Sequence, residues 1–270
     1  MTAYLMNGAG NAFLVLDARG DPDFAGIDAA RARELAARYA FDQLLLIEDS
    51  EDQDAFMRVI NADGSPSGAC GNGARCVAWL IMRESRGDAV TLDSDGGLLA
   101  VVAAGEMRVC VDLGEARTGW QDIPLSRDVD TMSLPISIDT GKGSLDAPGA
   151  VSMGNPHCVF FVENAETVPA RAIGHRVEHD PLFPERANVG FAQILSPDRL
   201  RLRVWERGVG LTQACGTGAA AALVAASRKG LSGRRATIIA DGGELTVEWR
   251  ADNHVTVEGP VELTETLHTV

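Results

Sequence analysis

The alternation of apolar and polar residues predicts short β-strands in the first part of the chain. The runs FLVLD, QLLLIE and AFMRVI are rich in β-branched or aromatic side chains, and Gly, Asp or Asn bounds them. LLAVV and MRVCVDL follow the same pattern, which places strands at 13–17, 43–48, 55–60, 98–102 and 107–113. Apolar residues at helical spacing instead predict helices over 28–40 and 74–84.

The same order of elements occurs twice. SGACGNGARCVAWLI begins at Ser67 and TQACGTGAAAALVAA begins at Thr212, so that Cys215 lies 145 positions after Cys70. Offsets of 144 to 146 also align GNAFLVLD with GNPHCVFF, MRVINADG with LRVWERGV, and DGGLLAVV with DGGELTVE. The repeat predicts two pseudo-symmetric α+β domains, each of mostly antiparallel strands wrapped around the helix that follows its cysteine.

The domain boundaries follow from the limits of the two copies. We expect one domain over 1–115 and a second over 116–261, with residues 262–270 returning to pair with the first. A chain of 270 residues is also long for a single core.

Composition narrows the classes of function. No apolar run approaches the roughly 18 residues of a membrane span, and the first residues lack the features of an export signal. We therefore expect a cytoplasmic protein that does not bind membranes. The net charge of -14 disfavours nucleic acid, whose phosphates need clustered Lys and Arg. Five cysteines without a CxxC pair predict free thiols and no metal site.

Cys70 and Cys215 each precede the start of a predicted helix. Unpaired N–H groups and the helix dipole at such a position stabilise a thiolate and can bind a substrate carboxylate. Four flanking glycines are expected to let the backbone approach a ligand and adopt positive φ: Gly71, Gly73, Gly216 and Gly218.

Two facing halves would present these thiols to opposite sides of one carbon, as inversion of a stereocentre requires. One thiolate would remove a proton and the other thiol would deliver one, while the helix N-termini stabilise the developing charge. Pyridoxal chemistry needs a Schiff-base lysine, and neither Lys142 nor Lys229 is placed for that role, so no cofactor is expected. A buried structural role is the alternative for any cysteine, and we assign it to those without a counterpart: Cys76, Cys110 and Cys158.

The motifs ACGNGAR and ERGVGLTQACGTGA, with GNAFLVLD and SMGNPHCVFFVE, resemble those of the diaminopimelate epimerase family over nearly the whole chain. The resemblance implies the fold of that family and a cofactor-independent epimerase, commonly a homodimer, that interconverts LL- and meso-2,6-diaminopimelate for lysine and peptidoglycan synthesis. It implies that Cys70 and Cys215 are the acid/base pair and that His157 and Glu206 are auxiliary catalytic residues. The substrate-binding residues that it implies are Asn11, Gln43, Asn61, Gly71, Asn72, Asn155, Asn188, Glu206, Arg207, Gly216 and Thr217.

The chain departs from the family pattern at three positions. NGAGNAF stands where the family often has HGLGNDF, which puts Asn7 and Ala12 in place of His and Asp, and Ala69 stands where Gln often precedes the first cysteine. We expect these changes to affect packing or substrate preference, because none removes an acid, a base or a carboxylate ligand.

Several other functions stay open. Proline racemases and hydroxyproline epimerases use the same mechanism, although their first motif is typically CGHG and this chain has CGNG at Cys70. A broader amino-acid racemase would differ only in how it recognises the distal group. A non-catalytic amino-acid binder has no need of both thiols. A nucleotide-binding enzyme is disfavoured, because TGKGS lacks the earlier glycine of a phosphate loop.

Overall fold

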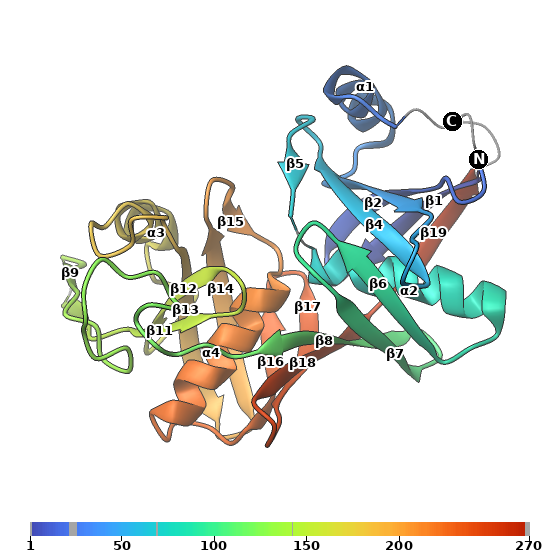
Figure 1. Ribbon diagram of the computed structural model, residues 1–270. Helices are drawn as coiled ribbons and strands as arrows, with labels where there is room; N and C mark the ends of the chain where they lie inside the picture. The colour runs from blue at the N-terminus through green and yellow to red at the C-terminus, as the bar shows by residue number, and fades with distance from the viewer. Residues whose placement is uncertain (1, 22–25, 69, 142, 268–270) are drawn as a thin grey trace. The chain divides into compact units, whose positions relative to one another are not determined.

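The computed structural model describes residues 2–21, 26–68, 70–141 and 143–267 (Figure 1). It divides into two compact units, Met1–Asp112 with Glu258–Val270, and Leu113–Val257. The chain leaves the first unit within strand β8 (Arg108–Glu115) and returns to it within β18 (His254–Pro260). These crossings lie a few residues before the boundaries that the repeat predicts.

The first unit is a β-sheet with one helix on each face. Its further elements are β1 (Thr2–Gly8), β2 (Asn11–Asp17), α1 (Ala29–Tyr39), β3 (Gln43–Glu48), β4 (Ala55–Asn61), β5 (Pro66–Ser67), α2 (Gly71–Ser85), β6 (Ala89–Ser94), β7 (Leu99–Gly105) and β19 (Glu262–Leu267). Strand β2 runs parallel to β3, and β4 runs parallel to β6, whereas β1–β2, β3–β4 and β6–β7 are antiparallel. The last strand, β19, pairs with β1.

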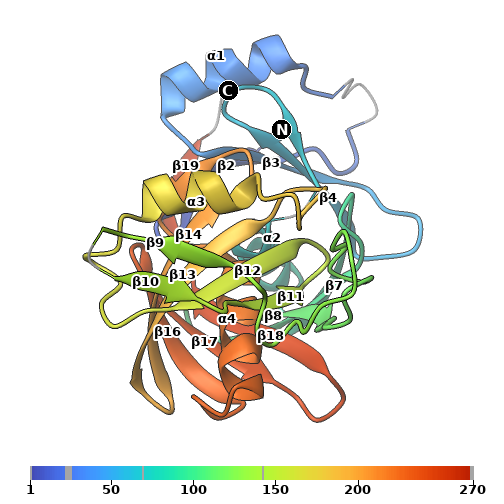
Figure 2. The ribbon, with the colours of Figure 1, turned by 90° about the vertical axis from the view of Figure 1, so that its left-hand side faces the viewer.

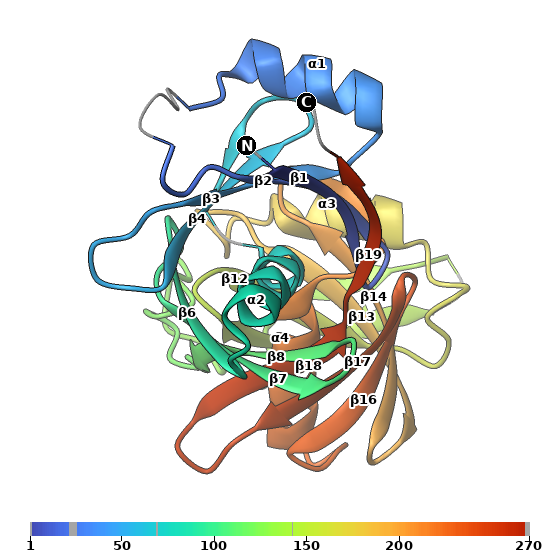
Figure 3. The ribbon, with the colours of Figure 1, turned by 90° about the vertical axis from the view of Figure 1, so that its right-hand side faces the viewer.

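Helix α2 is the central element of the first unit. Figure 3 shows it along its axis, with strands of this unit around it, and its residues 73–78 are buried. Helix α1 covers the other side of the sheet, where Ala32 and Leu35 pack against Leu14 and Leu44. Because side chains alternate between the two faces of a strand, β2 and β3 supply apolar residues to both helices. This explains why FLVLD and QLLLIE are nearly continuous apolar runs.

The second unit repeats this arrangement. Its elements are β9 (Ser137–Asp139), β10 (Ser144–Asp146), β11 (Gly149–Ser152), β12 (Pro156–Phe161), α3 (Ala170–Glu178), β13 (Asn188–Ser196), β14 (Arg199–Glu206), β15 (Gly210–Thr212), α4 (Gly216–Arg228), β16 (Arg235–Ala240) and β17 (Gly243–Trp249). The parallel pairs β12–β13 and β14–β16 correspond to β2–β3 and β4–β6. Figure 2 shows α3 across β12, β13 and β14, where Ile173 joins a core with Phe160 and Phe191. The predicted α+β architecture of two similar halves is confirmed.

Helix α4 is apolar on all sides and buried from Gly218 to Ala226, as a helix enclosed by strands must be. Two predicted details of the fold are wrong. The helix after the first cysteine begins at Gly71 rather than Ala74, because Cys70 itself forms its N-cap. In the first unit three strands follow that helix instead of the two predicted at 98–102 and 107–113, since β6 precedes them.

Candidate active site

In the first unit, Cys70 closes the N-terminus of α2. Its backbone is extended, with φ −146° and ψ 98°, and its Sγ accepts a hydrogen bond of 3.2 Å from the backbone N–H of Gly73. An N-cap side chain satisfies one of the N–H groups that the first helical turn leaves unpaired. The helix dipole favours negative charge at the same place. The fold therefore holds this thiol where its thiolate is stabilised.

A chain of polar side chains begins beside Cys70. The buried Asn72 donates from Nδ2 to Asn11 Oδ1 at 2.6 Å, and its Oδ1 accepts from Arg75 Nη2 at 2.9 Å. Arg75 was not among the predicted site residues, although it lies in the ACGNGAR motif, and its side chain is 0% exposed. The motif shows that a charged residue is present, but it does not show that this residue is buried.

Gln43 and Asn61 form a second polar pair in this unit. They lie opposite each other on β3 and β4, and Gln43 Nε2 donates to Asn61 Oδ1 at 2.9 Å. Asn61 Nδ2 also donates to Ser65 Oγ at 3.0 Å, so the amide of Asn61 is fixed by its neighbours. The structure thus brings Asn11 to Asn72 and Gln43 to Asn61 as two separate contacts.

The positions that depart from the family motif have local structural roles. Asn7 Oδ1 accepts from Gly10 N at 2.9 Å and closes the turn between β1 and β2. Ala12 N donates to Asp42 Oδ2 at 2.9 Å. Ala69 lies outside the described residues, as does Lys142.

In the second unit, Cys215 occupies the equivalent N-cap of α4. Its φ is −128° and its ψ is 112°, and its Sγ accepts from Gly218 N at 3.3 Å. The hydroxyl of Thr217 lies 3.5 Å from the sulfur. Burial, and then the neighbouring Glu206 carboxyl, raise the pKa of Cys215 well above its ordinary value, while the hydrogen bonds from Thr217 and Gly218 oppose this rise. Cys215 is therefore held as a neutral thiol.

Glu206 lies at the end of β14 beside this thiol. Its Oε1 accepts a hydrogen bond of 2.6 Å from Thr212 Oγ1. Burial raises the pKa of Glu206, whereas hydrogen bonds from Thr212 and Cys215 lower it. Because a carboxylate and a thiolate in contact disfavour each other, the pair retains a proton that can pass between oxygen and sulfur.

Two side chains, Asn155 and Thr217, link His157 to the thiol of Cys215. His157 Nε2 lies 2.9 Å from Asn155 Oδ1, and Asn155 Nδ2 donates to Thr217 Oγ1 at 3.4 Å. Burial, and then the charge of Arg207, lower the pKa of His157 to about 3, so its ring is neutral near pH 7. His157 Nε2 also lies 3.4 Å from Asn188 Nδ2, so this nitrogen lies between an amide acceptor on Asn155 and an amide donor on Asn188. The Thr217 hydroxyl, which accepts from Asn155, can then direct its own proton at the sulfur.

Asn188 and Glu178 hold the turn that follows Glu206. Asn188 lies next to His157 on the parallel strands β12 and β13, and its Oδ1 accepts from Arg207 N at 2.8 Å. Glu178, which sequence reasoning missed, accepts from Trp205 Nε1 at 2.7 Å and from Gly208 N at 3.0 Å. No motif marks Glu178, because its role depends on α3 packing against β14. The Arg207 side chain is exposed and donates to the Glu185 carbonyl at 2.8 Å.

Gly73 and Gly218 serve close packing beside the cysteines rather than positive φ. None of the four glycines that flank the cysteines has φ in the left-handed region, so that part of the prediction is wrong. A Cβ on Gly73 would lie 2.9 Å from the Leu45 methyl groups and 3.3 Å from Cys70 Sγ. A Cβ on Gly218 would lie 3.0 Å from Val204 Cγ2 and 3.2 Å from Cys215 Sγ. Because Gly73 and Gly218 have no side chain, there is room beside each of them for the sulfur of the neighbouring cysteine.

We expect Gly218→Ala to displace the Cys215 sulfur and lower kcat about 10- to 100-fold, because small misplacements of reacting groups cost that much. Overpacking should also lower the free energy of unfolding by about 1–3 kcal/mol. Gly233→Ala is the matched control, since a Cβ there meets only the Arg235 carbonyl at 3.9 Å. Steady-state rates and urea unfolding of both variants check this, and equal rates would contradict it.

The buried, neutral His157 predicts acid sensitivity of the fold. Its folded pKa lies below the ordinary value of 6.5, so its contribution to stability is present above pH 6.5 and is lost as the pH falls toward 3. At pH 5 this loss amounts to about 2 kcal/mol. Urea unfolding at pH 7.5 and pH 5.0 should show a steeper loss for the wild-type protein than for His157→Phe. A pH dependence that is unchanged in the variant would show that His157 already titrates normally.

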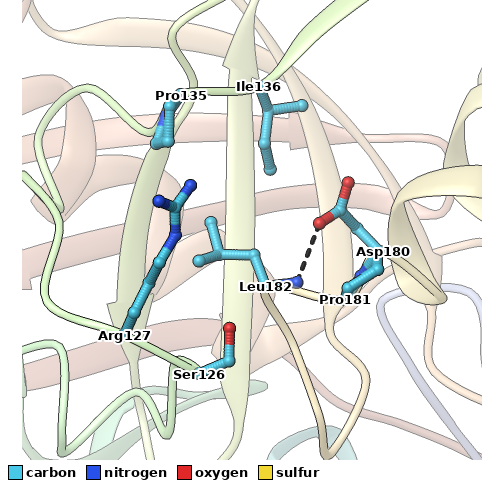
Figure 4. Close-up of a pocket in the computed structure, with 7 residues that line it drawn as sticks. All are labelled: Ser126, Arg127, Pro135, Ile136, Asp180, Pro181 and Leu182. Atoms are coloured by element: carbon cyan, nitrogen blue, oxygen red, sulfur yellow. Dashed lines mark hydrogen bonds between the residues drawn. The ribbon is translucent and has the colours of Figure 1, made fainter.

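Other parts of the described structure lie apart from the predicted site residues. Figure 4 shows a pocket of about 190 Å³ in the second unit, between Arg127 and Asp180, and its lining contains none of the predicted site residues. Lys229 lies at the C-cap of α4, at the opposite end from Cys215. Within the described ranges, no cluster of three or more His, Cys, Asp or Glu could hold a metal ion. In the same part of the chain, no helix is long and apolar enough to cross a membrane.

Comparison with solved structures shows which known structures share this fold. A predicted epimerase from Pseudomonas aeruginosa matches with a TM-score of 0.71 and 18% identity, covering 100% of this chain and 99% of that one. A hydroxyproline epimerase from Agrobacterium vitis matches with a TM-score of 0.66 and 15% identity, over 99% and 91% of the two chains. The chain therefore shares its fold over almost its whole length with these solved structures.

Sequence comparison identifies the family. The model of the diaminopimelate epimerase family matches residues 3–119 and 149–264. The diaminopimelate epimerase of Acidiphilium cryptum is 52% identical over 259 residues, which cover 96% of this chain and 92% of the relative. The chain belongs to the diaminopimelate epimerase family.

Proposed function

We propose that this protein interconverts LL- and meso-2,6-diaminopimelate without a cofactor, with Cys70 and Cys215 as the acid/base pair. The observation that carries this proposal is the equivalent placement of both thiols, each at the N-cap of a central helix and each accepting an N–H hydrogen bond. The name shared by relatives about half identical in sequence supports the substrate. The domain assignment, 1–115 with 262–270 and 116–261, is part of the same proposal.

The reaction requires one thiolate and one thiol. The thiolate takes the proton from Cα, and the electron pair of the C–H bond moves into the Cα–carboxylate system as an enediolate. The other thiol then gives its proton to the opposite face of Cα. The stereocentre is inverted, and the two sulfurs have exchanged protonation states. After Cys215 has donated its proton, the Cys215–Glu206 pair takes up one proton from solvent and the other thiol releases one, which restores the starting state. Glu206 can pass the incoming proton to Cys215, because the two groups are in contact.

Backbone N–H groups of the two helix N-termini would bind the reacting carboxylate. In the first unit these belong to Gly71 and Asn72, and in the second to Gly216 and Thr217. Such groups stabilise the negative charge that develops on the enediolate. They act through the backbone, which is why Asn72 and Thr217 can occupy equivalent positions with different side chains.

The polar side chains of each unit would bind the distal amino and carboxylate groups of diaminopimelate. Arg207 offers an exposed guanidinium suited to a carboxylate, and amide groups suit the distal ammonium. The amide residues in question are Asn11, Gln43, Asn61, Asn155 and Asn188. His157 and Glu206 would act beside the reacting centre through the contacts described above.

The setting of the reaction is also a proposal. We infer a homodimer in the cytoplasm that supplies meso-diaminopimelate to lysine and peptidoglycan synthesis, supported by family membership. Light scattering after size-exclusion chromatography should give twice the chain mass of 28.6 kDa. A single-chain mass would contradict the dimer.

Deuterium uptake tests the proposed substrate. Purified protein is incubated in deuterated water with LL-diaminopimelate, proline or histidine, and mass spectrometry follows the Cα position. Diaminopimelate should gain deuterium while meso isomer forms, and the other two amino acids should not exchange. Uptake into proline would favour the alternative of a proline racemase. Absence of uptake into diaminopimelate would overturn the proposal.

A further inference from the structure

Arg75 is a buried cation for which no counter-ion is found among the described residues. It is 0% exposed, and among the described residues it is the largest side chain that the fold buries completely. Its Nη2 donates to Asn72 Oδ1, and its Nε has no hydrogen-bond partner. None of the described carboxylates forms an ion pair with it. A buried charge is costly unless something compensates it, so this residue requires an explanation beyond packing.

The groups near Arg75 that can carry negative charge are thiols. Desolvation lowers the pKa of Arg75, and the charge of Arg108 adds to this, whereas negative charge on Cys76, Cys70 and Cys110 opposes it. Burial raises the pKa of Cys76 to about 12, which keeps that thiol neutral. Cys110 lies within strand β8, away from any helix N-terminus. Cys70 differs from these two thiols. Besides the nearby cation, its thiolate is stabilised by its position at the N-cap of α2 and by the hydrogen bond from Gly73.

Asn72 fixes the guanidinium in this position. Its Oδ1 accepts from Arg75, and its Nδ2 donates to Asn11 on β2. The amide is itself 3% exposed, so the contact is shielded from solvent. A cation held this way acts on its surroundings through a low dielectric, where its effect is larger than in water.

The second unit has the opposite charge beside its thiol. Ala220 occupies the position that matches Arg75, five residues after the cysteine in each helix. Glu206 occupies the position that matches the neutral Asn61. The two halves share their backbone arrangement, but one thiol lies near a guanidinium and the other contacts a carboxyl group.

We propose that Arg75 is a positioning residue that keeps Cys70 ionised in the resting protein. Cys70 is then ready to act as the base, and Cys215, which stays a neutral thiol, is ready to act as the acid. The roles of base and acid rest on the proposed function. The difference in ionisation between the two cysteines does not, because it follows from the charges around each sulfur.

Alkylation of the free protein measures this difference directly. Iodoacetamide reacts with thiolates, and peptide mass spectrometry reports Cys70 and Cys215 separately as the pH is varied from 5 to 10. In the wild-type protein the midpoint for Cys70 should lie below 8.5, the ordinary cysteine value, and below that for Cys215. Cys215 ionising first, or both together, would overturn the proposal without any variant.

Two substitutions separate charge from packing. Arg75→Met removes the cation and should raise the Cys70 midpoint by at least about one pH unit, a tenfold change in thiolate, while the Cys215 midpoint stays in place. Arg75→Lys keeps the charge and should retain most of the low midpoint. Circular dichroism and thermal melting verify that each variant is folded. An unmoved Cys70 midpoint in folded Arg75→Met would refute the role of Arg75.

The pH profile of activity gives an independent readout. In Arg75→Met the acidic limb of kcat should move to higher pH, and the rate should recover once Cys70 ionises unaided. A structural lesion would lower kcat at every pH, and a lost substrate contact would raise KM instead. Since the alkylation experiment uses no substrate, it can succeed even if deuterium uptake shows that the proposed substrate is wrong.

Discussion

Cys215→Ala and Cys70→Ala are each expected to lower kcat for diaminopimelate epimerisation by at least about 10³-fold, within the range that general acid–base groups contribute. Inversion needs a base on one face of Cα and an acid on the other, so neither thiol can replace the other. The rate is measured as formation of meso-diaminopimelate from the LL isomer. Substrate affinity, measured by calorimetry, should change little, since the backbone N–H groups remain.

Cys158→Ala is the matched control for these substitutions. Cys158 is also a buried cysteine of the second unit, but it belongs to the apolar core with Phe160 and Phe191. Its loss should reduce stability by removing a small apolar group and leave kcat close to wild type. Turnover that survives in Cys70→Ala or Cys215→Ala would exclude the two-thiol reaction and favour a binding protein or a different catalytic pair.

Glu206→Gln is expected to have the second largest effect, with kcat about 10²-fold lower. The amide can still accept from Thr212, but it cannot exchange a proton with Cys215. The same substitution should stabilise the fold at alkaline pH. Burial raises the pKa of Glu206 above that of the unfolded chain, so stability is greatest below the unfolded pKa and falls as the pH rises through the folded one.

The gain in melting temperature from Glu206→Gln should therefore be larger at pH 8 than at pH 5. Glu248→Gln is the control, because Glu248 is an exposed carboxylate paired with Arg235 on the surface. Melting curves at the two pH values, together with kcat, test both effects. A variant that is equally destabilised at both pH values would show that Glu206 is an ordinary ionised carboxylate.

Much of the fold could be predicted because the same order of strands and helices is encoded in both halves of the sequence. The strands at 13–17 and 43–48 are marked by apolar runs, and their counterparts in the second half confirm the order. Strand β1 and strand β6 were missed. Strand β1 pairs with β2 and β19, and β6 pairs with β4 and β7, and these partners are brought together by the tertiary structure.

Only those residues of the candidate site that belong to a motif or have a counterpart in the repeat could be predicted. Matching the halves brought out Asn11 with Asn155 and Asn61 with Glu206. Arg75 and Glu178 were missed, since a sequence shows that a charged residue is present and not that it is buried. The positive φ predicted for the four glycines was wrong. The close packing of Gly73 against Leu45 and of Gly218 against Val204 could not be predicted, because it depends on strands that are distant along the chain.

The sequence by itself determined two related halves, each with a cysteine before a helix, because residue identity and spacing are enough to define a repeat and an N-cap. Only the tertiary structure decided which charges surround each sulfur. Burial and the neighbours brought by β-sheet pairing set the pKa of Cys215, Glu206 and His157, since both depend on residues that are far apart in the chain. For that reason the two thiols, nearly identical in sequence context, lie in electrostatically opposite surroundings.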